Sequence, residues 1–195
     1  MWTAAILAGG QARRLGGLDK SALAVGASTV LQRQLAVLNG LTPHILIVGR
    51  ERMMDGDPPV RAVADRIAAA GALGGIYTAL LEAPTELVLV IACDMPCLTA
   101  PFLDLLAVRA ETEPEADVIV PRDDRGRHPL CATYRRRIAA TFRARIDAGE
   151  LRVLDALDAV TVREVSPDEV RAYDPDGRLL LNVNTPDDYA RAQQR

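Results

Sequence analysis

Short apolar runs alternate along the chain with longer segments in which apolar residues recur every three or four positions. The short runs are typical of buried strands. They lie at residues 4–7, 44–48, 60–64, 87–92 and 118–120. The longer segments have the spacing of amphipathic helices and lie at residues 30–38, 73–81 and 102–110. Strands that alternate with helices usually pair in parallel, so the pattern predicts an α/β fold around a mostly parallel sheet.

The second half of the chain is less regular, but its elements can still be predicted. We expect strands at 128–134, 161–165 and 179–183, and a helix at 135–148. Asp174-Pro175-Asp176-Gly177 indicates a turn before the last strand. Thr185-Pro186 then begins a final helix, because threonine can cap it and proline suits the first helical position. No repeat or linker divides the chain, so residues 1–195 are expected to form one domain.

The segment directly after the first predicted strand is rich in glycine and positive charge. From Leu7 to Lys20 it reads LAGGQARRLGGLDK. Glycine lets the backbone approach a ligand, and backbone N–H groups, arginine and lysine bind phosphates. The segment is not a Walker loop, because Asp19 stands where the second glycine belongs, and it has no G-x-G-x-x-G spacing. A surface turn with scattered charges is the alternative to a phosphate-binding loop.

Composition narrows the choice of ligand and location. Hydrophobic residues make up 49% of the 195 residues and aromatic residues 4%, so a sizeable aliphatic core can form. The net charge of −3 gives no basic field for nucleic acid, so a polyanion site must be local. No segment approaches the ~20 apolar residues of a membrane span, and no basic stretch precedes the first apolar run. The three cysteines fit no common zinc spacing, and we expect reduced thiols in a cytoplasmic protein.

Two acids follow predicted strands, at the edge where α/β proteins bind ligands. Asp94 comes directly after the most apolar strand, where a carboxylate can hold Mg²⁺ or simply cap a turn. Asp65 follows another strand and precedes the glycine-rich segment 71–75. Its carboxylate could accept hydrogen bonds from the edge of a guanine base. An ordinary surface aspartate beside a glycine-rich turn is the alternative.

Polar residues in the second half suggest a further binding region. His128 opens a predicted strand and is either a ligand contact near neutral pH or a structural histidine. Alternation along the predicted strand 179–183 places Asn182 and Asn184 on one face. Buried amides need partners, so the two asparagines either serve a site or pair with the neighbouring backbone and cap the last helix. Arg122, Arg125 and Arg127 could receive an anion, or could form a solvated loop.

These segments together resemble the molybdenum cofactor guanylyltransferases, a family that joins the nucleotide of GTP to the phosphate of molybdopterin. The resemblance rests on the loop at 7–20, on Cys-Asp-x-Pro at 93–96 and on Asn-x-Asn-Thr-Pro at 182–186, which occur in the family's order. It implies a Rossmann-like nucleotidyltransferase fold, with a mixed, mostly parallel sheet and helices on both faces. The N-terminal half would bind the nucleotide and the C-terminal half the acceptor.

The resemblance also implies roles for individual residues. Catalytic residues would be Lys20, Asp94, Arg14, Asn182 and Asn184. GTP would contact Leu7, Ala8, Gly9, Gly10, Lys20, Asp65, Gly74 and Asp94. The acceptor would contact His128, Asn182 and Asn184, and Asp94 would be the Mg²⁺ ligand. A molybdoenzyme or its chaperone would receive the product, with no nucleic acid or membrane involved.

One departure from the family pattern leaves the base open. Many members carry an asparagine where this chain reads Val48-Gly49-Arg50. A cytidylyltransferase acting on the same pterin is therefore an alternative, although Leu7-Ala8-Gly9-Gly10 favours the guanylyl type. A sugar-phosphate nucleotidyltransferase and a non-catalytic nucleotide sensor are further alternatives. The sensor would need neither a metal ligand nor an acceptor motif.

Overall fold

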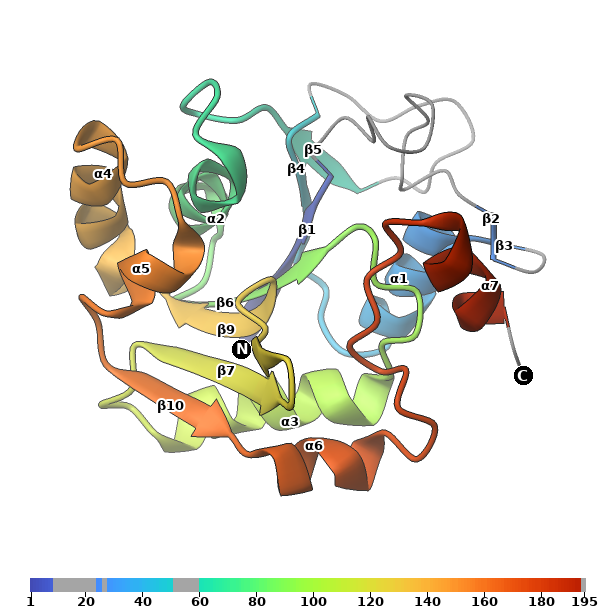
Figure 1. The fold of residues 1–195 in the computed structure, drawn as a ribbon. Coiled ribbons are helices and arrows are strands. Elements are labelled where there is room, and N and C mark those ends of the chain that lie inside the picture. The colour runs from blue at the N-terminus through green and yellow to red at the C-terminus, as the bar shows by residue number, and fades with distance from the viewer. Residues whose placement is uncertain (9–23, 26–27, 51–59, 194–195) are drawn as a thin grey trace.

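The fold is built around one mixed β-sheet that runs from the N-terminus to residue 165 (Figure 1). The computed structural model describes residues 1–8, 24–25, 28–50 and 60–193. The strands of the sheet are β1 (Trp2–Leu7), β4 (Ile45–Val48), β5 (Arg61–Val63), β6 (Leu87–Ala92), β7 (Val118–Asp123), β8 (Gly126–Arg127), β9 (Cys131–Arg135) and β10 (Val162–Val165). Their order is β10-β7-β9-β6-β1-β4-β5, and β8 pairs with β7. A separate small hairpin joins β2 (Ala24–Val25) to β3 (Ser28–Thr29).

The sheet is mostly parallel, as the alternation of strands and helices predicts. β1 pairs in parallel with both β4 and β6, β4 with β5, and β10 with β7. β9 runs antiparallel to its neighbours β6 and β7. In the centre, Ile6 pairs with Ile47 on one side and Ile91 on the other. All three isoleucines are fully buried, because a parallel strand is covered by helices on both faces.

Helices cover both faces of the sheet (Figure 1). They are α1 (Val30–Leu38), α2 (Gly71–Glu82), α3 (Ala100–Thr112), α4 (Ala139–Asp147), α5 (Val153–Leu157), α6 (Pro167–Tyr173) and α7 (Pro186–Gln193), with a 3-10 turn at Arg136–Ile138. Leu31 and Leu35 of α1 and Phe102 of α3 join the core on one face. Leu73 of α2 and Phe142 of α4 join the core on the other. None of the helices in the described ranges is long and apolar enough to cross a membrane.

The predicted strand at 179–183 is wrong. These residues are irregular, although Leu179, Leu180, Leu181 and Val183 are all buried. Leu179 and Leu180 pack onto the core of one sheet face, and Leu181 and Val183 form a small cluster with Ala192, but the segment does not pair with the sheet. Its backbone N–H groups bond elsewhere: Leu179 N donates to Asp174 Oδ1 at 2.9 Å, Leu181 N to Arg178 O at 3.0 Å, and Val183 N to Asp94 O at 2.8 Å. The apolar run at 179–183 thus predicts burial correctly. Burial alone, however, does not show that a segment pairs with a sheet.

Several boundaries differ from the prediction for local reasons. The strand expected at 128–134 begins only at Cys131, because a turn precedes it with Cys131 N donating to His128 O at 3.0 Å. The helix expected at 73–81 begins at Gly71. Helices α5 and α6 were not predicted. The signal for α6 is present in the sequence, since Ser166 and Glu169 form a capping box with Pro167 at the first helical position.

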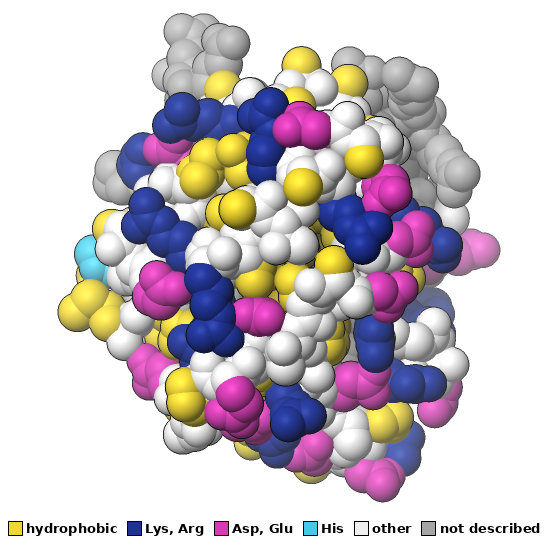
Figure 2. All heavy atoms as spheres, turned by 90° about the vertical axis from the view of Figure 1, so that its left-hand side faces the viewer, with side chains coloured by type: hydrophobic (Ala, Val, Ile, Leu, Met, Phe, Trp, Pro, Cys, Tyr) yellow, Lys and Arg dark blue, Asp and Glu magenta, His cyan; other side chains and the backbone are white. Residues whose placement is uncertain are grey.

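Positively and negatively charged side chains are mixed on the face of the molecule that lies at the left of Figure 1. Figure 2 shows arginines beside aspartates and glutamates over this face, without a large area of one sign. This agrees with the net charge of −3. The three cysteines are not joined by disulfides.

Candidate active site at the carboxyl edge of the sheet

The ends of β1, β4 and β6 meet at one edge of the sheet. Ala8 N donates to Val48 O at 2.8 Å, and Cys93 N donates to Leu7 O at 3.2 Å. Leu7 and Ala8, two of the predicted nucleotide contacts, therefore lie beside the turn that carries Asp94. The other predicted contacts of this loop, Gly9, Gly10, Arg14 and Lys20, lie outside the described residues.

Asp94 lies in a tight turn that directly follows β6. Its backbone carbonyl accepts the hydrogen bond from Val183 N, which brings the C-terminal segment 181–184 against the turn. Asn182, the neighbour of Val183, holds its side-chain oxygen Oδ1 buried, with no hydrogen-bond partner within the described ranges. A buried carbonyl-type oxygen of this kind needs a cation or a hydrogen-bond donor to offset its burial.

The oxygen donors near this turn fit Mg²⁺. Carboxylate and amide oxygens are hard ligands, and Mg²⁺ usually binds one or two protein groups while substrate phosphates and water supply the rest. Asp94 and Asn182 would be the protein ligands. Among the residues that the structure describes, no group of three His, Cys, Asp or Glu side chains forms a self-sufficient metal cage. An ion held by Asp94 and Asn182 would therefore need further ligands from a substrate or water.

A cavity next to the turn joins two of the predicted acceptor contacts. It has a volume of about 170 Å³ and is lined by Met95, Arg127, His128, Pro129, Leu130 and Asn182. His128 and Asn182 are 54 residues apart in the sequence, as their numbers show. They converge because the β8–β9 loop and the C-terminal segment both reach the end of β6.

Asp123 holds the imidazole of His128. Oδ1 of Asp123 lies 2.8 Å from Nε2 of His128, and the two side chains are mostly buried. Although burial raises the pKa of Asp123, hydrogen bonds from Arg125 and His128 outweigh it and lower the pKa from 3.8 to about 2. The carboxylate is therefore ionised at neutral pH and fixes the ring at the cavity wall. The sequence analysis missed Asp123, since nothing in the spacing of the two residues indicates the contact.

The three arginines near His128 are all engaged with acids. Arg127 Nε lies 2.6 Å from Glu164 Oε1, and Arg122 Nη1 lies 3.4 Å from Glu164 Oε2. Arg125 Nη2 lies 2.6 Å from Asp123 Oδ2. An anionic ligand at this hairpin would have to compete with these carboxylates. The structure thus favours a charge-paired surface loop over a phosphate receptor.

Asn184 does not share a strand face with Asn182, because the predicted strand is absent. The backbone around it instead caps α7. Asn184 N and Thr185 N both donate to Asp188 Oδ2, at 3.1 and 3.0 Å, and Asp188 N donates to Thr185 Oγ1 at 3.1 Å. The backbone at Asn184 and Thr185 therefore caps the last helix, which is the alternative given for these asparagines in the sequence analysis. Asn182, in contrast, lines the cavity.

Asp65 and Gly74 lie at the far side of the same edge, near the end of β5. Asp65 belongs to an exposed stretch, yet partial burial of its carboxyl group raises its pKa above 3.8. Gly74 is not in a loop but in the first turns of α2, where a Cβ atom would stand 2.5 Å from Ala70 Cβ. Packing of α2 against the preceding turn therefore explains the glycine. A contact of Asp65 or Gly74 with a nucleotide stays a prediction.

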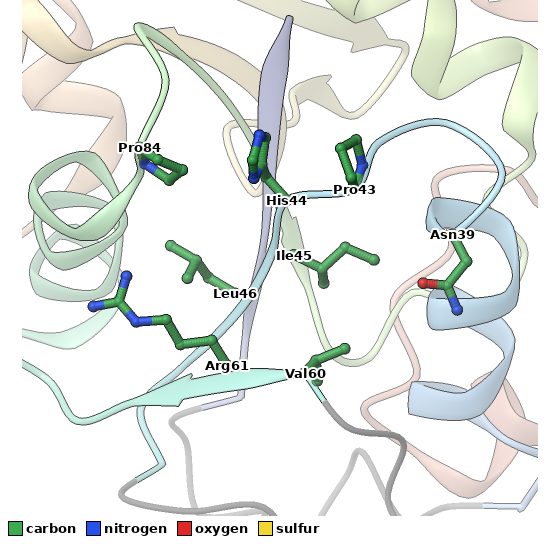
Figure 3. A pocket seen from close by; sticks show the side chains of 8 residues that line it. All are labelled: Asn39, Pro43, His44, Ile45, Leu46, Val60, Arg61 and Pro84. Atoms are coloured by element: carbon green, nitrogen blue, oxygen red, sulfur yellow. The ribbon is translucent and has the colours of Figure 1, made fainter.

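Two larger cavities lie apart from these residues. One, of about 310 Å³, is at the amino end of β4 and is drawn in Figure 3. It is lined by Asn39, Pro43, His44, Ile45, Leu46, Val60, Arg61 and Pro84. The other, of about 560 Å³, lies between Arg33, Tyr173 and Arg178. Neither is lined by a predicted site residue, so size alone does not locate the site.

The comparison with known families shows that the chain is an α/β nucleotidyltransferase. The family model described as "MobA-like NTP transferase domain" matches residues 4–161, and the chain belongs to this family.

Relatives along the whole length support this assignment. The chain is 36% identical over 199 residues to the probable molybdenum cofactor guanylyltransferase of Chloroflexus aggregans, with 99% of this chain and 94% of the relative covered. It is 31% identical to the molybdenum cofactor guanylyltransferase of Syntrophotalea carbinolica, over 97% of this chain and 89% of the relative.

Solved structures share the fold. Molybdopterin-guanine dinucleotide biosynthesis protein A from Archaeoglobus fulgidus superposes with a TM-score of 0.85 at 24% identity, over 99% of this chain and 97% of that one. The 2-C-methyl-D-erythritol 4-phosphate cytidylyltransferase of Thermus thermophilus superposes with a TM-score of 0.67 at 16% identity, over 99% and 98%. Proteins named for a guanine and for a cytidine product thus share this fold, so the fold alone does not indicate which nucleotide base is bound.

Proposed function

We propose that the protein transfers GMP from GTP onto the terminal phosphate of molybdopterin or its metal-bearing form. The observation that carries the proposal is the junction of the Asp94 turn with the segment of Asn182 through the bond from Val183 N to Asp94 O. It joins a strand end of the N-terminal half to the acceptor motif of the C-terminal half. Relatives that match nearly the full chain bear the name of this activity.

The chemistry requires positioning and charge neutralisation more than a strong base. An oxygen of the pterin phosphate attacks the α-phosphorus of GTP, the bond between the α-phosphorus and the bridging oxygen breaks, and its electron pair leaves with pyrophosphate. The attacking group is already an anion, so no proton has to be removed and no covalent enzyme intermediate is needed. Catalysis then consists of aligning two anions and offsetting their repulsion.

Each part of the site has a task in this reaction. The backbone from Leu7 to Gly10, with Arg14 and Lys20, would bind the triphosphate, as glycine-rich and basic loops do. Asp94 and Asn182 would hold Mg²⁺, which supplies positive charge between the phosphates. His128, fixed by Asp123, would contact the acceptor at the small cavity. Asp65 would accept hydrogen bonds from the guanine edge.

Location and product transfer follow from the same proposal. We propose a cytoplasmic location, where the thiols of Cys93, Cys97 and Cys131 would stay reduced. The dinucleotide product would pass to a molybdoenzyme or its chaperone.

The experiment compares GTP and CTP as donors, with molybdopterin supplied, and measures pyrophosphate release. Release with GTP and only in the presence of acceptor supports the proposal. Release with CTP alone would make the protein a cytidylyltransferase, the closest alternative. GTP binding without release would indicate a nucleotide sensor.

A further inference from the structure

Gln34 is a polar residue in the apolar stripe of α1. The buried residues of this helix are Val30, Leu31, Gln34, Leu35 and Leu38, and the glutamine is only 3% exposed. Its side-chain Nε2 donates to Ala92 O at 2.8 Å and to Met95 O at 3.1 Å. These two carbonyls stand on either side of Cys93-Asp94. One buried amide thus spans the turn that carries the proposed metal ligand.

An apolar residue would fill this position at lower cost to stability. Burying an amide is unfavourable unless all its polar atoms are paired. Gln34 pairs its Nε2, but its Oε1 is buried and has no hydrogen-bond partner in the described part of the chain. Packing and folding alone therefore do not account for a glutamine between leucines. A task at the turn does, because the amide group is suited to hold two carbonyls at a fixed separation.

The turn is held from three directions. Gln34 bonds the carbonyls on either side of Cys93-Asp94, from the α1 side. Val183 N bonds the carbonyl of Asp94 from the C-terminal segment. Cys93 N bonds Leu7 O at the end of β1. Of these contacts, only the first is made by a side chain, so only it can be removed by a single substitution without altering the backbone.

We propose that Gln34 is a positioning residue that sets the place of the Asp94 carboxylate, and with it the affinity of the site for a divalent cation. This rests on the proposed function, in which Asp94 is the metal ligand. Groups that hold a ligand from behind commonly change metal affinity by about 10- to 100-fold when they are replaced.

The test measures Mn²⁺ binding to the protein with a non-hydrolysable GTP analogue, by the electron paramagnetic resonance signal of free Mn²⁺. Gln34→Met keeps the volume of the side chain and removes both hydrogen bonds. We expect it to weaken Mn²⁺ binding by about 10-fold or more. If it fails to fold, Gln34→Leu, which also lacks N–H donors and matches the buried leucines of α1, takes its place with the same expectation.

A matched control separates positioning from loss of stability. Thr42 is 5% exposed, and its Oγ1 donates to Trp2 O at 2.6 Å, at the opposite end of β1. Thr42→Val likewise replaces a buried hydrogen-bonding side chain with an apolar one, away from the Asp94 turn, and should leave Mn²⁺ affinity unchanged. Equal Mn²⁺ affinity in wild type and Gln34→Met would overturn the inference, as would an equal loss in Thr42→Val.

A second control tests the site itself. If Asp94→Asn binds Mn²⁺ as tightly as the wild type, Asp94 is not a metal ligand and the proposed site fails. If Asp94→Asn weakens binding and Gln34→Met does not, the site stands and only the role of Gln34 is lost.

Discussion

Asp94 and Lys20 are the residues on which the proposed chemistry depends most directly. Asp94 lies in the turn after β6, and Lys20 ends the glycine-rich segment that follows β1. Electrostatic contacts to a transferring phosphate commonly contribute about 3–4 kcal/mol each to the transition state. We predict that Lys20→Ala and Asp94→Ala each lower turnover at least about a hundredfold.

Steady-state kinetics measure this loss, and circular dichroism checks that each variant keeps its fold. Asp94→Asn, which keeps the shape and removes the charge, should lose turnover like Asp94→Ala. Near-normal turnover in the Lys20 or Asp94 alanine variant contradicts the assignment of that residue.

Asp123 should make stability depend on pH in the acid range. Its pKa is lowered from 3.8 to about 2 in the folded protein, so it stabilises the fold fully above about pH 4 and loses this effect as pH falls toward 2. Asp123→Asn should therefore lower the free energy of unfolding by about 2 kcal/mol at pH 7. The difference should shrink steadily below pH 4.

Urea unfolding of both proteins between pH 7 and the lowest pH that allows reversible folding measures this difference. Asp124→Asn is the control, because the neighbouring side chain of Asp124 is 94% exposed. A difference between wild type and Asp123→Asn that does not change with pH would show that the carboxylate is not stabilised in this way.

The sequence pattern predicts the acids and amides of the proposed site but not the residues that contact them. Asp94 stands out because it follows the most apolar strand, β6. Gln34 and Asp123 do not, since one looks like an ordinary polar position of a helix and the other like a loop acid. Gln34 bonds a residue 58 positions away, and Asp123 contacts a histidine five positions away. Neither contact can be predicted from the periodicity of apolar residues. Roles for Arg14 and Lys20 rest on the resemblance alone.

At the scale of elements, the start of α2 depends on two adjacent glycines with different surroundings. A Cβ at Gly74 would stand 2.5 Å from Ala70 Cβ, an atom that cannot move without the backbone. A Cβ at Gly75 would stand 3.3 Å from Leu7 Cδ2, which can rotate away. We predict that Gly74→Ala lowers the free energy of unfolding by about 1–3 kcal/mol.

Gly75→Ala is the matched variant. It gains helix propensity of up to about 1 kcal/mol and should cost less than Gly74→Ala. Chemical denaturation of both variants measures the comparison. If Gly75→Ala proves the more destabilising, the close approach of α2 to Ala70 does not determine the glycine at 74.

Strands that are buried on both faces were the easiest elements to predict. β1, β4 and β6 lie in continuous apolar runs, because helices cover both faces of the sheet. The segment 179–183 shows the same pattern and is not a strand, since it is buried against side chains and the Asp94 turn instead. The five-residue helix α5 is too short for its period to be read from the sequence.

At the scale of the whole molecule, one reversed strand brings the two halves of the chain to a single edge. β9 runs antiparallel to β6, so its first residue, Cys131, pairs with Ile91 near the end of β6. The loop with His128, which precedes β9, therefore lies at the carboxyl edge of the sheet. If β9 were parallel to β6, this loop would lie at the opposite edge. The C-terminal segment reaches the same edge through Val183.

This topology suits the two-substrate site that we propose. In that proposal the ends of β1 and β6 would bind the nucleotide, whereas the β8–β9 loop and the C-terminal segment would bind the acceptor. Both proposed substrates are anions, and the net charge of −3 gives no overall positive field that would attract them. Binding of the two substrates would therefore depend on the residues at the carboxyl edge of the sheet.

The most direct test of guanylyl transfer is the product. The protein is incubated with GTP, Mg²⁺ and molybdopterin, and the mixture is analysed by mass spectrometry, with CTP in a parallel reaction. The account predicts the guanine dinucleotide of the pterin, formed in equal amount with pyrophosphate and absent from the Asp94→Ala reaction. Absence of the guanine dinucleotide with intact acceptor, or formation of a cytosine dinucleotide alone, would contradict it.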